Sequence, residues 1–331
     1  MSVGTGLATI APPRSIAAVD EALTLELAAL DAALHDTLAA SIAPATTKVY
    51  QHDWAVFTAW CEQHGATALP ATPETVARYL QDLARDHAPA TLTQHCTAIS
   101  AAHQAAGFEE PPTRSMLVRK TLSGLRRQLG VAQTGKAPLT VEDLRAIAAH
   151  LRPGLIGARD QAILTVGLAS GMRRSELVAL NVEDLEWSDD GVAIVIRRSK
   201  TDQEGAGAKV PIGATGSPLC PVAALRAWLE AAAIDSGPVW RSIDRHGRVG
   251  GRLCSHGVSL VVKHYVAAIG RDPRDFGAHS LRAGMATAAA RARVEERDIM
   301  RQGRWQSTMI CRRYIREGDM WRVNIAAAIG L

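Results

Sequence analysis

The chain has 331 residues, 47% of them hydrophobic and 21% charged, which excludes an intrinsically disordered protein and allows two domains with separate cores. Its formal net charge of +4 permits a nucleic-acid partner but does not require one. The positions of the basic residues therefore matter more than their total.

The N-terminal part of the chain is expected to be helical after a short tail. Residues 1–18, rich in Ala, Gly, Pro and Ser, predict a disordered tail. From Asp20 onward apolar residues recur near helical spacing, and breaks are expected at Gly65, at residues 70–73 and 88–89, at Gly107 and at residues 111–112. Residues 19–130 are therefore predicted to form a compact all-helical domain.

A linker and the start of a second domain follow. The segment after Gly130 loses the helical pattern and contains a further glycine, a lysine and a proline, which predicts an interdomain linker over residues 131–138. Thr140 lies three residues before Asp143, an arrangement typical of a helix start.

The second domain, residues 139–331, is expected to combine helices with a small β-structure. A helix over residues 159–170 is expected to end at Gly171. Two β-branched runs, residues 192–196 and 209–212, predict a hairpin around a Gly-rich loop. The predicted fold class is mainly α, with an all-helical N-terminal domain and a C-terminal α+β domain that holds a small β-hairpin or sheet.

Other classes of protein lack support in the sequence. The five cysteines show no CxxC spacing, so neither a zinc site nor a disulfide framework is predicted for Cys61, Cys96, Cys220, Cys254 and Cys311. The sequence shows no export signal, no run of about twenty apolar residues, no Walker-type loop and no carboxylate cluster at metal-ligand spacing. We therefore expect a cytoplasmic protein with no membrane partner, no metal and no cofactor.

Arg173 and Glu176 form the first candidate pair for chemistry. Arg173 follows the predicted helix end, so its guanidinium could project from a rigid turn toward a phosphoryl group. Glu176 is near enough to orient it. Taken alone, the pair is better explained as a local ion pair that contributes under about 1 kcal/mol.

His279 and Arg282 form the second pair, and Lys200 is a further candidate. The i, i+3 spacing of the pair puts both side chains on one helical face, where they could hold the non-bridging oxygens of a phosphate. An isolated pair of this kind is more often a helix-terminal histidine and a solvated arginine. Lys200, in the loop of the predicted hairpin, could protonate a leaving 5′-oxygen or could be a solubilising charge.

Tyr314 is a tyrosine in basic surroundings, close to Arg312, Arg313 and Arg316 and nine residues after Trp305. Cationic neighbours favour a phenolate and attract phosphate, as a phenolic nucleophile requires. A buried tyrosine is more often a core residue, so the local chemistry leaves both readings open.

The full series resembles the active site of the tyrosine recombinase (phage integrase) family, in the order Arg173, Glu176, Lys200, His279, Arg282, Trp305 and Tyr314. The resemblance covers about residues 46–325. It implies a core-binding domain over residues 19–130 and a catalytic domain over residues 139–331. Trp305 stands where many members have histidine, and both side chains can donate a hydrogen bond.

The resemblance also implies a role for each residue. Tyr314 would attack the scissile phosphate and form a 3′-phosphotyrosyl intermediate with a free 5′-hydroxyl on the other fragment. Because this intermediate conserves the energy of the broken bond, neither ATP nor a metal is needed. Arg173 and Arg282 would hold the non-bridging oxygens of the phosphate, and Lys200 would act as the general acid. His279 would assist proton transfer, and Trp305 would donate its indole N–H to the phosphate. Glu176 would support the site.

The implied partner is a double-stranded DNA recombination site, with paired inverted repeats around a spacer, bound by a homotetramer on two sites. Candidate phosphate contacts, each with a solvated surface as the alternative, are Lys48, Arg119, Lys120, Arg126, Arg127, Arg241, Arg245 and Arg252. The resemblance places Thr91, Gln94 and His95 toward the major groove, where Gln94 could pair with adenine.

Three functions are compatible with these residues. A site-specific DNA recombinase is favoured by the complete series. A type IB topoisomerase-like enzyme would share the arginine, lysine and tyrosine chemistry, but the helical domain and the apolar C-terminal segment disfavour it. A non-catalytic DNA-binding regulator would require a degenerate site, which the complete series disfavours.

Overall fold

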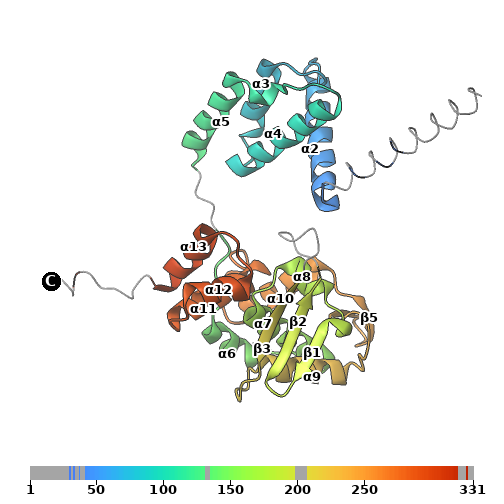
Figure 1. Ribbon diagram of the computed structural model, residues 1–331, viewed down its shortest axis with the longest axis vertical. Helices are drawn as coiled ribbons and strands as arrows, with labels where there is room; N and C mark the ends of the chain where they lie inside the picture. Colours follow the sequence, from blue (N-terminus) through green and yellow to red (C-terminus); the bar gives the residue numbers. More distant parts are fainter. Residues whose placement is uncertain are drawn as a thin grey trace, which may run out of the picture. The chain divides into compact units, whose positions relative to one another are not determined.

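The computed structural model describes residues 42–130, 135–197 and 207–319, together with the single residues 30, 33, 37 and 326. The chain divides into two compact units, Met1–Gln133 and Thr134–Leu331. Each unit has its own hydrophobic core. Figure 1 shows the helices and strands of both units. The predicted tail, the first half of the predicted linker, the loop that holds Lys200 and, apart from residue 326, the C-terminal segment 322–331 lie outside the described residues.

The described part of the first unit is all-helical, and the predicted breaks coincide with helix boundaries. In chain order it contains α2 (Pro44–Gln63), α3 (Pro73–Leu83), α4 (Pro89–Ala105), the 3-10 helix η1 (Pro112–Arg114) and α5 (Met116–Leu129). Helices α2, α3 and α4 each have a proline in the first turn, where a missing N–H costs no intrahelical bond. Ser115 caps α5 by accepting the Val118 N–H.

Aromatic side chains fill the centre of the first unit. Helix α2 packs on α4, and α3 packs on α5. Between them Phe57 and Tyr79 are almost fully buried, with ring centroids 5.0 Å apart. Trp60 lies against Tyr79 and donates its indole N–H to Asp82, which ties the end of α2 to α3. The apolar faces of α2 and α3 therefore meet in one core.

The described part of the second unit is mainly helical with two small antiparallel sheets. Its helices are α6 (Val141–Ala148), α7 (Leu155–Ser170), α8 (Arg174–Ala179), η2 (Val182–Asp184), α9 (Pro221–Ala231), α10 (Ser255–Ala268), α11 (His279–Arg291), α12 (Glu296–Gly303) and α13 (Thr308–Asp319). Its strands are β1 (Leu185–Ser188), β2 (Gly191–Ile196), β3 (Ala208–Gly213), β4 (Arg241–Ile243) and β5 (Val249–Arg252). This arrangement confirms the predicted fold class.

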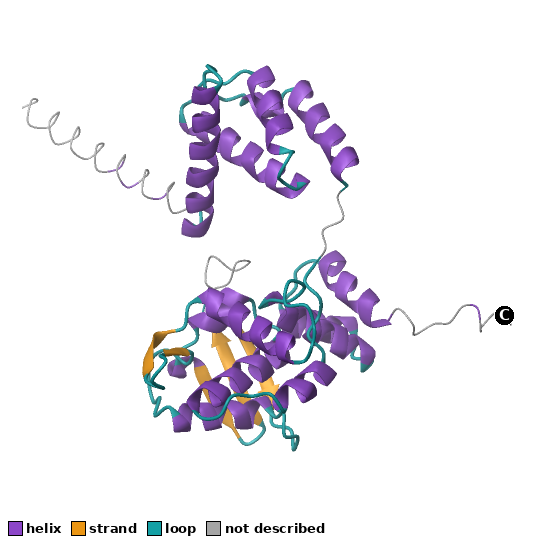
Figure 2. Cartoon of the chain, turned by 180° about the vertical axis from the view of Figure 1, so that it is seen from behind, coloured by secondary structure: helices purple, strands orange, loops and turns teal. Residues whose placement is uncertain are grey.

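The strands form one three-stranded sheet in the order β1-β2-β3 and one two-stranded sheet of β4 and β5, both within the second unit (Figure 2). Helices α7 and α9 pack against β3. The predicted hairpin corresponds to β2 and β3, in which Ile194 pairs with Val210. Strand β1 escaped prediction because three of its four residues are exposed, and β4 and β5 are too short to show an alternating pattern.

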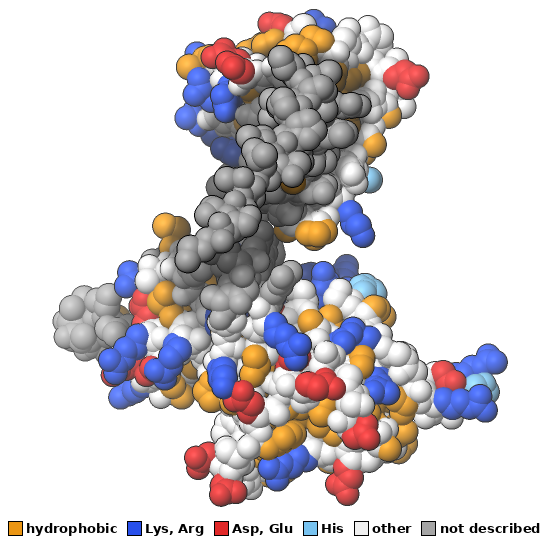
Figure 3. Space-filling model, turned by 45° about the vertical axis from the view of Figure 1, so that its right-hand side comes forward, with side chains coloured by type: hydrophobic (Ala, Val, Ile, Leu, Met, Phe, Trp, Pro, Cys, Tyr) orange, Lys and Arg blue, Asp and Glu red, His pale blue; other side chains and the backbone are white. Residues whose placement is uncertain are grey.

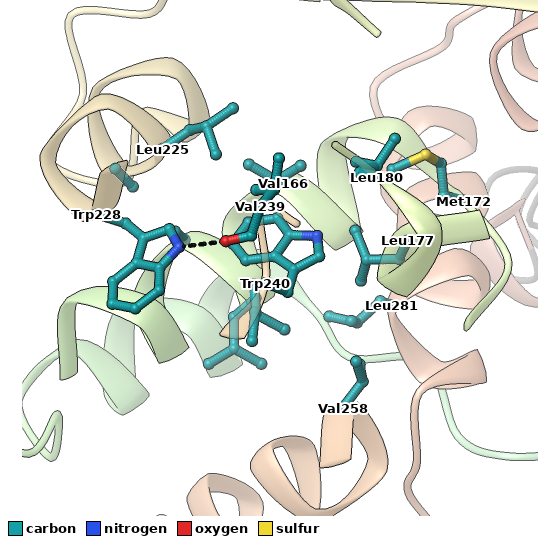
Figure 4. Close-up of a cluster of buried hydrophobic side chains, with 14 of the residues drawn as sticks. Val166, Met172, Leu177, Leu180, Leu225, Trp228, Val239, Trp240, Val258 and Leu281 are labelled. Carbon is teal, nitrogen blue, oxygen red and sulfur yellow. Dashed lines mark hydrogen bonds between the residues drawn. The ribbon is translucent and has the colours of Figure 1, made fainter. Parts of the chain in front are cut away.

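The main core of the second unit lies directly beneath two of the predicted catalytic segments. Met172, Leu177 and Leu281 are at most 2% exposed and belong to a cluster centred on Trp228 and Trp240 (Figure 4). The Trp228 indole donates a 2.8 Å hydrogen bond to the Val239 carbonyl within that cluster. Each of the first three residues is the chain neighbour of a predicted catalytic residue, so core packing fixes the backbone at the site.

A second, smaller cluster holds the C-terminal helices together. Helices α11, α12 and α13 pack on one another and lie together in the unit (Figure 1). Met285, Ile299, Trp305 and Cys311 are buried between them, and Tyr314 packs against this cluster. No helix in the described ranges is both long and apolar enough to cross a membrane.

Two helix boundaries bear on the sequence predictions. Thr140 and Asp143 form a reciprocal capping box at the start of α6. The usual acidic residue of such a box is Glu, and here Asp takes its place. Helix α7 ends at Gly171, as predicted, in the left-handed conformation with φ 56°. The helix begins at Leu155, earlier than predicted, because Leu155 packs against the main core and extends the buried face.

Two helical glycines should respond to substitution with opposite signs. A Cβ at Gly284 in α11 would collide with the backbone carbonyl of Leu139, whereas a Cβ at Gly124 in α5 would meet no atom within 4 Å. Gly284→Ala is expected to destabilise the protein by about 1–3 kcal/mol. Gly124→Ala is expected to stabilise it by about 0.5–1 kcal/mol through helix propensity. Urea unfolding of the full chain measures both changes, and equal effects of the two substitutions would contradict the packing described here.

Candidate active site

Glu176 lies at the centre of the site and orients Arg173. Arg173 is the residue before α8, and its backbone N–H donates a 2.8 Å hydrogen bond to one carboxylate oxygen of Glu176. The Arg173 guanidinium donates a 2.6 Å bond to the other oxygen. The Glu176 side chain is only 2% exposed, so the pair is held largely away from water and is stronger than a surface ion pair.

Arg304 is the second arginine that binds the Glu176 carboxylate, and it was not predicted from the sequence. Its Nη2 donates a 2.7 Å bond to the carboxylate oxygen that also accepts the Arg173 backbone N–H. Its Nη1 donates to the Gln302 carbonyl at 3.0 Å. The one feature of the sequence that could have indicated Arg304 is its position directly before Trp305, a predicted catalytic residue.

Helix α11 contributes His279 at its first position and Arg282 one turn later. Arg282 is 2% exposed and donates a hydrogen bond to the carbonyl of Gly171, at the end of α7. Its guanidinium carbon lies 4.1 Å from the centroid of the Trp305 ring, a cation–π contact. Arg282 thus links α7, α11 and the segment before α13.

Tyr314 on α13 is half-buried, and its hydroxyl lies 2.6 Å from Nε2 of His279. The Trp305 ring lies on another side of the phenol, with centroids 5.8 Å apart. The Thr287 hydroxyl donates to the Tyr314 backbone carbonyl at 3.5 Å. The phenol is therefore positioned by α11, by α13 and by the segment that joins α12 to α13.

The site favours a neutral histidine beside the phenol. Loss of solvent around the ring lowers the pKa of His279 first, and the charges of Arg282, Arg173 and Arg313 lower it further below the usual 6.5. As a whole residue His279 is exposed, so its pKa is lowered less than full burial would lower it. A neutral ring can accept a proton at Nε2, and the 2.6 Å contact places the phenol proton within reach.

The arginines and the carboxylate keep their charges despite burial. Burial lowers the pKa of Arg282 to about 10, with Arg173 and Arg304 adding to the effect, so it stays protonated near neutral pH. Burial opposes ionisation of Glu176, but the Arg173 backbone N–H and the charge of Arg304 together hold its pKa below the ordinary value. Three guanidinium groups and one carboxylate leave an excess of positive charge beside Tyr314, which suits a bound phosphate.

Six of the seven predicted catalytic residues thus lie in one cluster in the second unit. These are Arg173, Glu176, His279, Arg282, Trp305 and Tyr314. Lys200 lies outside the described residues. No group of His, Cys, Asp and Glu able to hold a metal occurs in the described ranges.

The predicted major-groove residues of α4 differ in exposure. His95 is 5% exposed, and its Nδ1 lies 2.8 Å from the Tyr79 hydroxyl, so it lies beneath the surface and not on it. The helical register explains the difference, because His95 faces α3 and α2 in the core of the first unit. Gln94 is exposed and donates to Asp53 at 2.8 Å, and Thr91 is half-buried.

The predicted phosphate contacts are mostly exposed but differ in what their side chains bind. Exposed residues of the first unit are Lys48, Arg119, Lys120, Arg126 and Arg127, of which Arg126 donates to the Thr93 hydroxyl. In the second unit Arg241 and Arg252 donate to backbone carbonyls, whereas Arg245 lies in the exposed turn between β4 and β5. On the face seen in Figure 3 basic and acidic side chains are interspersed, so net charge alone marks no binding surface there.

The chain is similar in sequence to a known protein family and to several known proteins. Residues 138–319 match the phage integrase family. The chain is 41% identical over 284 residues to an integrase/recombinase xerD homolog of Selenomonas ruminantium, a match that covers 84% of this chain and 83% of the relative. It is 24% identical over 297 residues to the recombinase cre of Escherichia phage P1, covering 81% of this chain and 85% of the relative.

The fold is also found among solved structures. The XerH site-specific recombinase, solved in a post-cleavage complex with a palindromic difH substrate, matches with a TM-score of 0.59 and 18% identity, over 78% of this chain and 72% of that chain. In sequence, Trp60-Cys61, residues 91–95 and Tyr314-Ile315-Arg316 resemble Cre as well. These matches confirm the resemblance inferred from the catalytic series, and the chain belongs to the phage integrase family as a tyrosine recombinase.

Proposed function

We propose that the protein is a site-specific DNA recombinase that cuts and rejoins strands through a covalent bond between Tyr314 and a 3′-phosphate. The observation that carries the proposal is the 2.6 Å contact between the Tyr314 hydroxyl and His279 Nε2, beside an excess of guanidinium charge. A core tyrosine would not need a neutral base and buried arginines around its hydroxyl. A nucleophilic tyrosine needs both.

The first half of the reaction follows from these positions. The Tyr314 oxygen attacks the scissile phosphorus while its proton passes to His279, and the bond between phosphorus and the 5′-oxygen breaks. Arg173 and Arg282 hold the non-bridging oxygens as negative charge grows on them. The Trp305 indole N–H donates to the same phosphate. Glu176 keeps Arg173 in place throughout.

The leaving 5′-oxygen requires a proton, and Lys200 is proposed to supply it. An ammonium on a long flexible stem is a suitable general acid. Strand exchange follows when the 5′-hydroxyl of a second duplex attacks the phosphotyrosine, which breaks the bond to Tyr314 and returns the proton. One phosphodiester is broken and one is made, so the exchange consumes no external energy source.

The partner is proposed to be a DNA site with inverted repeats around a spacer, bound by four protomers on two duplexes. Each duplex must be cut on both strands, and each protomer carries one Tyr314. Four nucleophiles are thus needed for a complete exchange between two duplexes. A type IB topoisomerase-like enzyme needs one nucleophile, and a regulator needs none.

Replacing Tyr314 by Phe is expected to abolish a protein–DNA adduct. The test incubates the protein in EDTA with a pool of nicked duplexes whose binding arms are randomised, because loss of a short cut fragment traps the covalent intermediate. The adduct is detected as a protease-sensitive shift of labelled DNA. Tyr50→Phe serves as the matched control and should form the adduct as the wild type does.

Two outcomes would contradict the proposed mechanism. One is the absence of any adduct with the wild type, and the other is an undiminished adduct with Tyr314→Phe. Once a cleaved sequence is known, exchange between two labelled duplexes separates a recombinase from a topoisomerase-like enzyme, which would relax supercoiled DNA without joining partners.

The cleavage rate should fall in acid as His279 becomes protonated. The protonated ring cannot accept the phenol proton, so the rate is retained above the pKa of His279 and lost as the pH falls through it. Because that pKa is lowered, the midpoint should lie below 6.5. Arg313→Gln removes one of the cations that lower it and should move the midpoint to higher pH. Single-turnover rates at DNA concentrations well below saturation report the free protein and measure this shift.

A neighbouring arginine provides the control for the pH experiment. The Arg312 guanidinium is paired with Glu296, whereas the pKa of His279 is lowered by Arg282, Arg173 and Arg313. Arg312→Gln should therefore leave the midpoint in place. A midpoint above 6.5 in the wild type, or equal shifts in both variants, would refute the assignment of His279 as the proton acceptor.

Deleting residues 322–331 should leave binding to one DNA site intact and weaken pairing of two sites. This segment is apolar at helical spacing and, by resemblance, docks on a neighbouring protomer. Gel mobility shift separates single-site complexes from paired sites. Unchanged pairing by the truncated chain would exclude the segment as the assembly contact.

A further inference from the structure

We propose that Arg304 is a positioning residue of this active site: it holds Glu176 in place for Arg173 and ties the segment that carries Trp305 and Tyr314 to α8. The inference rests on the proposed strand cleavage and names a residue that controls it. Arg304 would act through Glu176 and Trp305 and would not touch the phosphate.

The first support is the sharing of one buried carboxylate. Arg304 binds the same oxygen of Glu176 that accepts the Arg173 backbone N–H, while the other oxygen binds the Arg173 guanidinium. The side chains of Glu176 and Arg304 are 2% and 12% exposed. Removing one partner of a buried pair leaves the other charge poorly compensated. Without Arg304, Glu176 would depend on Arg173 alone, and the Arg173 guanidinium would be drawn toward it and away from a phosphate.

The second support is the backbone of Arg304. The residue lies at the end of α12 in the left-handed region, with φ 55°, a conformation that an arginine adopts at some cost. The turn directs the next residue, Trp305, against Arg282. A glycine would suit this backbone better, so the arginine is explained by its side chain and not by the turn.

The third support is the geometry of the guanidinium. One nitrogen of the fork reaches Glu176 and the other reaches the Gln302 carbonyl in its own helix. The fork thereby joins the end of α12 to α8, across a long sequence separation. The buried Nε–H has no hydrogen-bond partner among the described residues. The two terminal nitrogens, Nη1 and Nη2, therefore hold the guanidinium in place. A lysine could reach Glu176 but could not make both contacts.

The test measures single-turnover cleavage of the DNA selected above at saturating concentration. Arg304→Gly keeps the turn and removes the guanidinium, and it should slow cleavage by about 10- to 100-fold while DNA binding stays unchanged. Added guanidinium ion should restore part of the rate relative to sodium chloride at equal ionic strength. In Glu176→Gln, the further change Arg304→Gly should add little, because the two residues act as one unit.

A matched control comes from the same helix. Arg301 is exposed and paired with Asp298, away from the site, so Arg301→Gln should cleave at the wild-type rate. Should Arg304→Gly fail to fold, as judged by circular dichroism, Arg304→Lys decides: a reduced rate supports the inference and a full rate overturns it.

The inference is overturned by wild-type cleavage in Arg304→Gly, by rescue equal to that of sodium chloride, or by independent effects of Arg304→Gly and Glu176→Gln. An inactive wild type would overturn the proposed function and this inference with it. An active wild type with an equally active variant overturns this inference alone.

Discussion

The site depends on the carboxylate of Glu176, which is buried and shared by two arginines. A buried carboxylate stays ionised only if hydrogen bonds and positive charge compensate its lost hydration, and here the Arg173 backbone, the Arg173 guanidinium and Arg304 provide both. The same contacts fix the directions of the arginines. The negative charge of Glu176 therefore reduces the repulsion between Arg282 and the guanidinium groups of Arg173 and Arg304. The remaining positive charge would favour a bound phosphate.

Packing of the main core fixes the backbone on which this site is built. Met172, Leu177 and Leu281 are buried in the main core (Figure 4). They are the chain neighbours of Arg173, Glu176 and Arg282, respectively. A buried apolar neighbour restricts the backbone on each side of it, so the catalytic side chains start from fixed positions. The predicted effect of Gly284→Ala on stability has the same origin, because α11 carries both that glycine and Arg282.

The class of fold could be predicted from the sequence, and the candidate site residues could be named from their order in the chain. The contacts between those residues could not be predicted. Helix breaks were predictable because proline and glycine act locally, as at Pro73 and Gly171. The catalytic series was predictable as an ordered set. Arg304 was not, because its partner Glu176 lies more than a hundred residues away and no local pattern marks a long-range ion pair. His95 shows the reverse error, since only the packing of α4 on α2 and α3 reveals that its ring is buried.

The proposed phosphate clamp and the proposed nucleophile are held by different contacts, and α11 contributes to both. Arg173 and Arg282 are held by Glu176 and by the carbonyl of Gly171, within the main core. Tyr314 belongs to the smaller cluster of α11, α12 and α13 and meets the clamp through the His279 contact and through Trp305. A displacement of α13 would therefore lengthen the path from the phenol to its base while leaving the clamp intact. In the proposed mechanism, such a displacement would stop cleavage at Tyr314 and leave phosphate binding by Arg173 and Arg282 in place.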